Sequence, residues 1–305
     1  MTAEAVRRAP VAAVREPGLL DRALPVLAVL AGLAVVWYLG AIWLNAPQVL
    51  ERVFADRTDV GWRKLVQATW SMERPVLPAP HQIALDMFHS VFDWPLASPR
   101  NLLFHAGVTS GATLLGFALG TLLGAVLAVA IVNLPTLERA LFAWIIASQT
   151  IPVLAIAPII IVILGNFNLT GLLPKALISM YLCFFPVVVA MVKGLRSPGV
   201  FERELMHTYA ASQRQAFWKL RLPASLPFLF PSLKVAIAAG LVGAIVGELP
   251  TGAQAGLGAR LLTGSYYGNT VQIWSALVMA ALLGVLLTAA VALAERAFVA
   301  GGGKP

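Results

Sequence analysis

Long runs of apolar residues recur along this chain. The first of them, Leu24–Leu44, continues for 21 residues without a charged side chain. As a helix this run would extend about 31 Å, which is enough to cross the hydrocarbon core of a bilayer. A segment inside a bilayer must satisfy its own backbone hydrogen bonds, so such runs predict helices. Five further runs of similar length follow, at Gly107–Val132, Leu141–Gly165, Leu172–Val192, Phe228–Gly247 and Val271–Leu293. The sequence therefore predicts an all-α membrane protein with six transmembrane helices.

The composition supports an integral membrane protein and argues against a soluble one. Hydrophobic residues make up 59% of the 305 residues and charged residues 12%, whereas soluble domains have roughly 45–50% and about 25%. The net charge of +8 does not indicate nucleic-acid binding, because the basic residues gather near the ends of the spans. The single cysteine, Cys183, lies in an apolar run. It excludes a disulfide within the chain, and we expect it to be a small buried side chain.

The apolar runs divide the chain into parts with different expected environments. We expect an N-terminal tail at residues 1–22, a first span at 23–44, a polar segment at 45–106, a five-helix core at 107–298 with a long connector at 194–227, and a C-terminal tail at 299–305. In the polar segment, Ile83, Met87 and Val91 share one face of an amphipathic helix, which we expect at the membrane surface. In the predicted topology, 14 of the 22 Lys and Arg residues lie on the same side of the membrane as the N-terminus. This bias predicts that both termini are cytoplasmic.

Small residues predict close packing of one span. Gly116, Gly120 and Gly124 recur every four residues and therefore lie on one face of a helix. Such a stripe lets the backbone of another helix approach closely.

The connector at 194–227 contains an unusual mixture of basic, amide and aromatic residues. Met206, Tyr209, Gln213, Phe217 and Leu220 are spaced as one face of a helix. A second face at steps of seven holds His207, Arg214 and Arg221. The apolar face must be covered by the protein's own spans, by lipid or by a soluble partner, and the pattern alone leaves all three open.

The order of residues in this connector resembles the cytoplasmic "EAA" loop of binding-protein-dependent ABC transporter permeases. The residues that carry the resemblance are Glu204, the run Tyr209-Ala210-Ala211-Ser212, Phe217, Leu220, Leu222 and Pro223. Further segments resemble core spans of the nitrate, sulfonate and taurine branch of that family, which also includes importers of pyrimidine-type thiamine precursors. These are VLPAPHQIALDMF, HAGVTSGATLLGFALGTLLG, SQTIPVLAIAPIIIVILG, FFPVVVAMVKGL and AGLGARLL, and the resemblance covers roughly residues 75–298.

The resemblance implies the permease core of a type I ABC importer, of the MetI-like kind, with an extra N-terminal span. In that family the loop docks on a separate ATPase subunit, so the implied coupling residues are Glu204, Tyr209, Ala210, Ser212, Phe217, Leu220, Leu222 and Pro223. It also implies a bacterial inner-membrane location, a second permease copy or paralogue, and a periplasmic or lipid-anchored substrate-binding protein. ATP and Mg²⁺ would be held by the ATPase, and we expect no cofactor in this chain.

The loop departs from the family pattern at two places. Leu205 and Met206 replace the alanine pair after the acid, and Ala210 replaces a glycine. If the backbone at Ala210 is left-handed, alanine costs on the order of 1 kcal/mol relative to glycine.

Several residues within the spans are candidates for the translocation path. Gln149, Thr150 and Pro152 interrupt an apolar run, so they predict either a kink satisfied by neighbouring helices or a polar lining of the path. Glu248 borders a span, where an acid is often functional, although a small shift would place it in water. Phe184 and Phe185 could contact solute or serve only in packing, and Tyr266 and Tyr267 would mark the outer interface.

Two other classes of function stay open at this stage. An intramembrane enzyme would need a catalytic set, but the sequence contains no H-E-x-x-H or G-x-S-x-G motif. A self-sufficient secondary transporter often shows an internal repeat and mid-membrane coupling charges, and neither is visible. The terminal GGGKP lacks the spacing and hydroxyl residue of a phosphate-binding loop, so the chain is not expected to hydrolyse ATP. The solute itself is not determined by these patterns.

Overall fold

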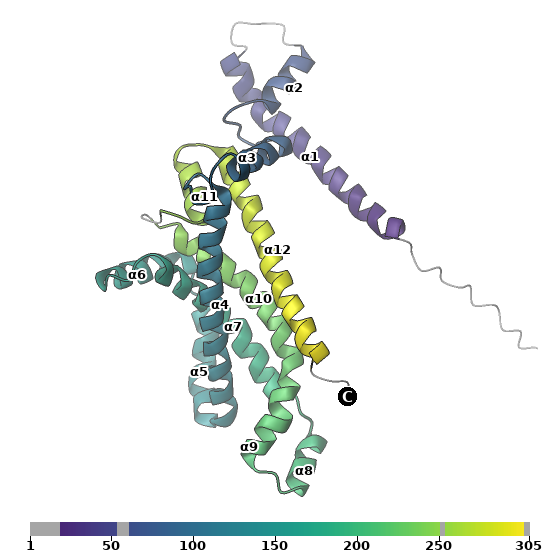
Figure 1. The fold of residues 1–305 in the computed structure, drawn as a ribbon, viewed down its shortest axis with the longest axis vertical. Coiled ribbons are helices and arrows are strands. Elements are labelled where there is room, and N and C mark those ends of the chain that lie inside the picture. Colours follow the sequence, from purple (N-terminus) through teal and green to yellow (C-terminus); the bar gives the residue numbers. More distant parts are fainter. Residues whose placement is uncertain (1–18, 54–60, 251–253, 302–305) are drawn as a thin grey trace, which may run out of the picture. The chain divides into compact units, whose positions relative to one another are not determined.

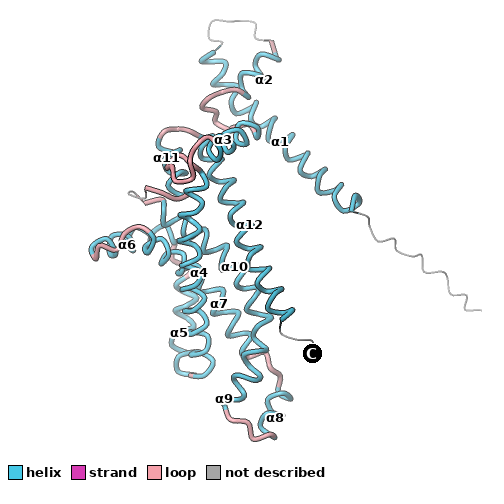
Figure 2. The backbone as a smooth tube through the Cα atoms, viewed as in Figure 1, coloured by secondary structure: helices cyan, strands magenta, loops and turns pink. Residues whose placement is uncertain are grey.

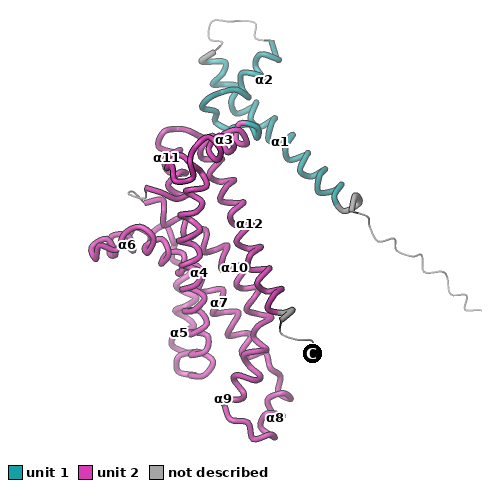
Figure 3. The backbone as a smooth tube through the Cα atoms, in the orientation of Figure 1, with its two compact units in different colours: residues 1–81 teal, residues 82–305 magenta. Residues whose placement is uncertain are grey.

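The computed structural model describes residues 19–53, 61–250 and 254–301, and every regular element within these ranges is a helix. Figures 1 and 2 show the order of these helices along the chain. The prediction of an all-α membrane protein is confirmed. The chain forms two compact units, residues 1–81 and 82–305 (Figure 3).

In the residues that the structure describes, the first unit includes α1 (Leu19–Val53) and α2 (Trp62–Trp70). Asn45 of α1 is fully buried. Its side-chain oxygen accepts from the amides of Val76 and Leu77 at 2.7 and 3.2 Å, and its nitrogen donates to the Leu77 carbonyl at 2.9 Å. These bonds satisfy backbone groups that have no helical partner and hold the returning chain against α1.

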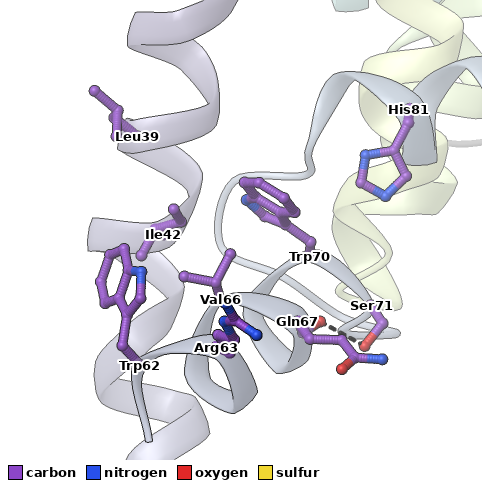
Figure 4. A pocket seen from close by; sticks show the side chains of 9 residues that line it. All are labelled: Leu39, Ile42, Trp62, Arg63, Val66, Gln67, Trp70, Ser71 and His81. Atoms are coloured by element: carbon purple, nitrogen blue, oxygen red, sulfur yellow. Dashed lines mark hydrogen bonds between the residues drawn. The ribbon is translucent and has the colours of Figure 1, made fainter.

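A mainly apolar pocket of about 660 Å³ lies between α1 and α2 in this unit (Figure 4). It is lined by Leu39, Ile42, Trp62, Arg63, Val66, Gln67, Trp70, Ser71 and His81. Tyr38 stacks on His81 and meets the edge of Trp70, so aromatic contacts shape this part of the unit.

The second unit holds the remaining helices; α3 begins at the boundary between the units. Their bounds are α3 (Pro80–Phe92), α4 (Leu102–Asn133), α5 (Pro135–Ser148), α6 (Val153–Asn166), α7 (Leu172–Leu195), α8 (Val200–Thr208), α9 (Gln213–Ala216), η1 (Phe217–Arg221), α10 (Leu222–Glu248), α11 (Leu257–Tyr266) and α12 (Thr270–Gly301). In Figure 1, α8 and α9 lie at one end of this unit and α11 at the other.

Helix α7 packs against both α4 and α10 because small residues line the two contacts. A Cβ on Gly120 of α4 would lie 2.5 Å from Cys183 Cβ and 3.0 Å from the Met180 carbonyl oxygen. On the other side, a Cβ on Gly243 of α10 would lie 2.8 Å from Ser179 Cα. The predicted glycine stripe therefore does bring helix backbones close together. Cys183 is fully buried, as expected, and its thiol donates to the Ala236 carbonyl at 3.1 Å.

Five helices in the described ranges are long and apolar enough to cross a membrane. A sixth span exists only if α5 and α6 count as one, and these two helices are bent by 101° at the break between them. The expected continuous run Leu141–Gly165 is thus two helices. Pro152 lacks an amide hydrogen and its ring crowds the preceding turn, which explains why the helix does not continue.

The predicted amphipathic helix is α3, but its apolar face is not turned to lipid. Ile83 is buried, and Met87 and Val91 pack against a core cluster that contains Leu102 and Leu257. The face formed by Ile83, Met87 and Val91, which was expected to lie on the membrane surface, is therefore covered by the protein itself. Leu85, Phe88 and Phe92 of the same helix are exposed instead.

Candidate functional site

The connector between α7 and α10 is a pair of short helices separated by a tight turn. At the end of α8, the amide of Ala210 donates to the His207 carbonyl at 2.9 Å, and the amide of Ala211 donates to the Met206 carbonyl at 3.0 Å. These two bonds form a Schellman motif, in which the residue after the helix cap adopts a left-handed conformation. That residue is Ala210, with φ 50°.

The backbone at Ala210 is left-handed, so the condition under which alanine costs more than glycine at this position is met. The turn is built in the ordinary way for a Schellman motif, and alanine occupies the position that glycine would fill without strain. The turn is therefore less stable than the same turn with glycine, by about 1 kcal/mol.

The second half of the connector starts with a capping box. The Ser212 hydroxyl accepts from the Gln215 amide at 3.2 Å, and the Ser212 amide donates to Gln215 Oε1 at 2.8 Å. Helix α9 then passes into the π-helical turn η1 and into α10. Pro223 cannot donate the amide hydrogen bond that would continue a regular helix, so the backbone is wound differently just before it.

The interruption splits the apolar face that the spacing predicted. Met206 and Tyr209 belong to the end of α8, whereas Phe217 and Leu220 belong to η1, so these residues do not form one stripe. The expectation of a single continuous helix is wrong. The S-x-x-Q spacing of Ser212 and Gln215 was the sequence signal that marks the start of a new helix.

The connector residues differ in what covers them. Phe217 and Leu222 pack against the buried cluster around Cys183 and Val187, so the protein's own spans cover them. Tyr209 is 77% exposed and Trp218 is 59% exposed. Other surface residues of the connector are Phe201, Glu204, Leu205, Ser212 and Pro223, while Leu220 is half-buried. An exposed set of aromatic and aliphatic side chains thus remains uncovered by the described part of the chain.

The break between α5 and α6 leaves polar groups of the S-Q-T-I-P run partly satisfied by their own turn. Thr150 Oγ1 donates to the Ala147 carbonyl at 2.8 Å, and Gln149 Nε2 donates to Ser148 Oγ at 3.3 Å. The Tyr181 hydroxyl of α7 donates to the Ser148 carbonyl, which ties the break to the core. Thr150 and Pro152 are exposed and Gln149 is half-buried.

Glu248 is fully buried at the end of α10. Its carboxylate accepts from Thr109 Oγ1, at 3.0 Å to each oxygen, and from the Gly258 amide at 2.9 Å. Lys175 Nζ lies 3.7 Å from Glu248 Oε1 and also donates to the Ala255 carbonyl at 2.7 Å. A buried carboxylate with several donors and a cation nearby is satisfied as an anion.

The same cluster holds the start of α11. Three successive amides at its N-terminus donate to side chains: Gly256 to His105 Nδ1 at 3.0 Å, Leu257 to Thr109 Oγ1 at 2.9 Å, and Gly258 to Glu248. The first amides of a helix have no partner within it, so these side chains complete the helix end. Because Nδ1 of His105 accepts, its Nε2 carries the hydrogen that is donated to the Pro99 carbonyl at 2.8 Å.

A cavity of about 770 Å³ lies beside this cluster. It is lined by residues of α4, α6, the loop from α6 to α7, α7, the end of α10 and the segment after it: Gly107, Val108, Gly111, Ile161, Gly165, Leu169, Thr170, Gly171, Leu172, Pro174, Lys175, Gly247, Pro250, Gln254 and Ala255. Lys175 lines the cavity, whereas Glu248 is buried and is not one of the lining residues. Gln149, Thr150 and Pro152 do not line it either.

Comparison with known proteins agrees with this arrangement. The family model described as "binding-protein-dependent transport system inner membrane component" matches residues 120–301, more than half of the chain. The chain belongs to this family of ABC transporter permeases. The matched region includes the connector, the α5–α6 break and Glu248, whereas α1, α2 and α3 lie outside it.

The permease is similar to several transport proteins. It is 33% identical to the formylaminopyrimidine transport permease protein ThiX of Halalkalibacterium halodurans, over 71% of this chain and 82% of the relative. It is 31% identical to the riboflavin transport system permease protein RibX of Chloroflexus aurantiacus, over 73% and 80%. A putative aliphatic sulfonates transport permease protein SsuC of Bacillus subtilis is 24% identical over 83% and 86%.

Two aromatic residues of the permease core are placed in packing positions. Phe184 is buried in the cluster around Cys183, and Phe185 packs against the same cluster. Both therefore contact other parts of the chain. Tyr266 and Tyr267, at the end of α11, are 71% and 73% exposed.

Proposed function

We propose that this permease is the membrane-spanning subunit of an ATP-driven importer in a bacterial inner membrane. It would work with two ATPase subunits, a second permease copy or paralogue, and a periplasmic or lipid-anchored binding protein that delivers a small polar solute. Both termini would be cytoplasmic, which follows from the bias of Lys and Arg toward that side. The observation that carries the proposal is the connector, whose exposed aromatic residues are held on a well-defined pair of helix ends.

The connector is suited to transmit a movement because its central turn is hydrogen-bonded and its far end is packed against the core. The Schellman motif fixes the turn at Ala210, and Phe217 and Leu222 anchor the far end in the core beside α7. A partner that pulls on Tyr209 and Trp218 would therefore move α7 and α10 together. Closure of an ATPase dimer at this loop would then rock the spans and open the path in the alternating-access manner.

ATP and Mg²⁺ belong to the partner subunit in this proposal. The chain has no G-x-x-x-x-G-K sequence followed by Ser or Thr, which is the usual backbone cradle for phosphates. The permease would supply the path and the coupling surface, and hydrolysis would take place elsewhere.

For the solute we propose a small pyrimidine-type compound. Support comes from the similarity to the formylaminopyrimidine permease, at 33% identity. A sulfonate, taurine-like compound or nitrate is the second candidate, and the aliphatic sulfonate relative favours it. Binding of each solute to the companion binding protein would separate the two.

The coupling surface is tested by co-purification of the ATPase with a tagged permease in detergent. The variant is Tyr209→Asp with Trp218→Asp, because both side chains are exposed and their loss leaves the core intact. A charged side chain loses its hydration when an apolar contact buries it, so we expect at least a tenfold loss of bound ATPase. Phe217→Asp is a poor choice, since Phe217 packs against the core and its variant would also disturb folding.

The matched control is Tyr266→Asp with Tyr267→Asp, equally exposed aromatic residues at the other end of the unit. This control should retain the ATPase. If folded wild-type permease brings down no ATPase at all, the importer proposal fails and a self-sufficient transporter becomes the better explanation.

A further inference from the structure

Three arginine side chains converge on a small polar pocket near the connector. The pocket has a volume of about 330 Å³ and is lined by Val132, Leu195, Arg196, Pro198, Arg203 and Arg221. These residues come from the end of α4, the end of α7, helix α8 and η1. The stretch from residue 195 to 221 therefore places three arginines around one space, and the end of α4 closes it with an apolar side chain.

The three guanidinium groups are unequally satisfied. Arg196 forms a bidentate pair with Glu138, with Nη1 and Nη2 at 2.8 and 2.7 Å from the two carboxylate oxygens. These hydrogen bonds raise the pKa of Arg196 above its ordinary value. Within the described residues, the Arg203 side chain donates through Nε alone, to the Gly199 carbonyl at 3.2 Å. Arg221 makes no side-chain hydrogen bond or ion pair with the described part of the chain.

The acidic residues nearby do not neutralise this pocket. Glu138 is already engaged by Arg196, and Glu202 and Glu204, which flank Arg203 in the sequence, are not among its lining residues. The donors of Arg203 and Arg221 are therefore available to an anion. Arginine presents its donors as a planar fork that matches the oxygens of a phosphate group.

The position of the pocket distinguishes a lipid from other anions. Helix α7 ends at Leu195, α4 ends at Asn133, and α10 begins at Leu222, so three apolar spans stop at this level. The 24 residues of α7 would extend about 36 Å, slightly more than the hydrocarbon core. If these helices cross the bilayer, their lengths place the pocket near the level of the lipid phosphates, with apolar Val132 and Leu195 beside the arginines.

We propose that this pocket binds the phosphate of an anionic lipid headgroup of the inner leaflet. Arg203 and Arg221 supply the contacts and the net positive charge, and Arg196 lies beside them, neutralised by Glu138. Basic pockets between spans on the cytoplasmic side are known to suit such headgroups. The bound lipid would link α8 and η1 to the ends of α4 and α7. The choice of leaflet rests on the orientation given in the proposed function.

The test measures lipid binding to purified permease in detergent, with no ATPase present. Native mass spectrometry would compare phosphatidylglycerol with phosphatidylcholine of the same acyl chains, for wild type and for Arg203→Gln with Arg221→Gln. We expect wild type to prefer phosphatidylglycerol, and the double variant to bind it at least tenfold more weakly. Arg214→Gln with Lys219→Gln removes two charges from the same connector outside the pocket and should bind phosphatidylglycerol like wild type.

Three outcomes would overturn the proposal. Equal phosphatidylglycerol affinity of the double variant and wild type would show that the pocket is not the lipid site. Displacement of the lipid by millimolar inorganic phosphate would assign the pocket to a soluble anion. Normal lipid binding with loss of ATPase co-purification in the double variant would assign the arginines to a protein contact. A failure of the ATPase to bind wild type leaves the lipid result unaffected, so the two proposals fail separately.

Discussion

Thr109 and Glu248 are 139 residues apart in the sequence, yet the Thr109 hydroxyl lies 3.0 Å from each oxygen of the Glu248 carboxylate. The same hydroxyl accepts from the Leu257 amide at 2.9 Å. One threonine of α4 therefore bridges the end of α10 and the start of α11. Because all these atoms are buried, replacing any one of them leaves a polar group without water or protein to bond it.

Glu248→Gln should strongly destabilise the permease. The amide would keep the size of the side chain but remove the negative charge beside Lys175, which is buried and would lose its ionic partner. Breaking a buried pair in this way costs about 3 kcal/mol. The measurement is the free energy of unfolding in detergent micelles, obtained by titration with a denaturing detergent.

Glu295→Gln is the control for that experiment. Glu295 pairs with Lys234 at 2.5 Å, but both side chains are partly exposed, at 27% and 34%. Glu295→Gln should lower the free energy of unfolding by less than about 1 kcal/mol. Equal effects of the two variants would contradict the view that burial makes the Glu248 pair costly to break.

Gly256→Ala should be poorly tolerated for two reasons. Its φ of +125° is a conformation that L-residues rarely adopt, and an added Cβ would overlap the Glu248 carboxylate. We expect a loss of about 3 kcal/mol, from backbone strain and overpacking together. Gly268→Ala is the milder comparison, since Gly268 has φ +63° and no neighbouring atom within 4 Å; it should cost about 1 kcal/mol. Thermal unfolding of both variants side by side should show the larger loss at position 256, where the backbone region is one that only glycine commonly adopts.

Ala210→Gly should stabilise the turn of the connector. Glycine adopts φ 50° without strain, so the turn should gain about 1 kcal/mol. Hydrogen exchange of the amides around Ala211 and Ser212 should slow about fivefold, which is the equivalent change in the local opening equilibrium.

Ala211→Gly is the neighbouring control. Ala211 is not among the described residues with positive φ, so glycine there only adds flexibility to the unfolded chain. Its exchange should be unchanged or faster. Slower exchange in this control would mean that the effect at position 210 does not arise from the left-handed backbone.

Gly120→Ala and Gly107→Ala should change stability in opposite directions. The methyl group at position 120 would meet Cys183 and the Met180 carbonyl, so α4 and α7 must separate at a cost of about 2 kcal/mol. At position 107 no atom lies within 4 Å, and alanine there is the better helix former by up to about 1 kcal/mol. Unfolding free energies of the two variants, measured in the same detergent, decide whether the glycine stripe acts through helix contact.

Some features of the site followed directly from local patterns. The glycine stripe and the buried Cys183 each depend on a few neighbouring residues or on a fixed helical period. The strain at Ala210 was expected from the family resemblance, on the condition that its backbone is left-handed, and the structure meets that condition. The secondary structure of the connector was harder to predict, because its apolar spacing fits one continuous helix while the Ser212–Gln215 capping box starts a new helix. Local capping bonds outweighed the periodic pattern, since they satisfy backbone groups that a continuous apolar face would not.

The sequence by itself determined that the chain crosses a membrane as helices, because hydrocarbon cannot bond to an open backbone. It also indicated the family, through the resemblance of the loop from Glu204 to Pro223 and of several core segments to ABC transporter permeases. Only the tertiary structure decided which of those residues face outward, with Tyr209 exposed and Phe217 packed against the spans. It likewise decided that Glu248 holds the start of α11, because its partners come from α4 and α7. Burial and long-range hydrogen bonds depend on how the helices pack, and no local pattern encodes that packing.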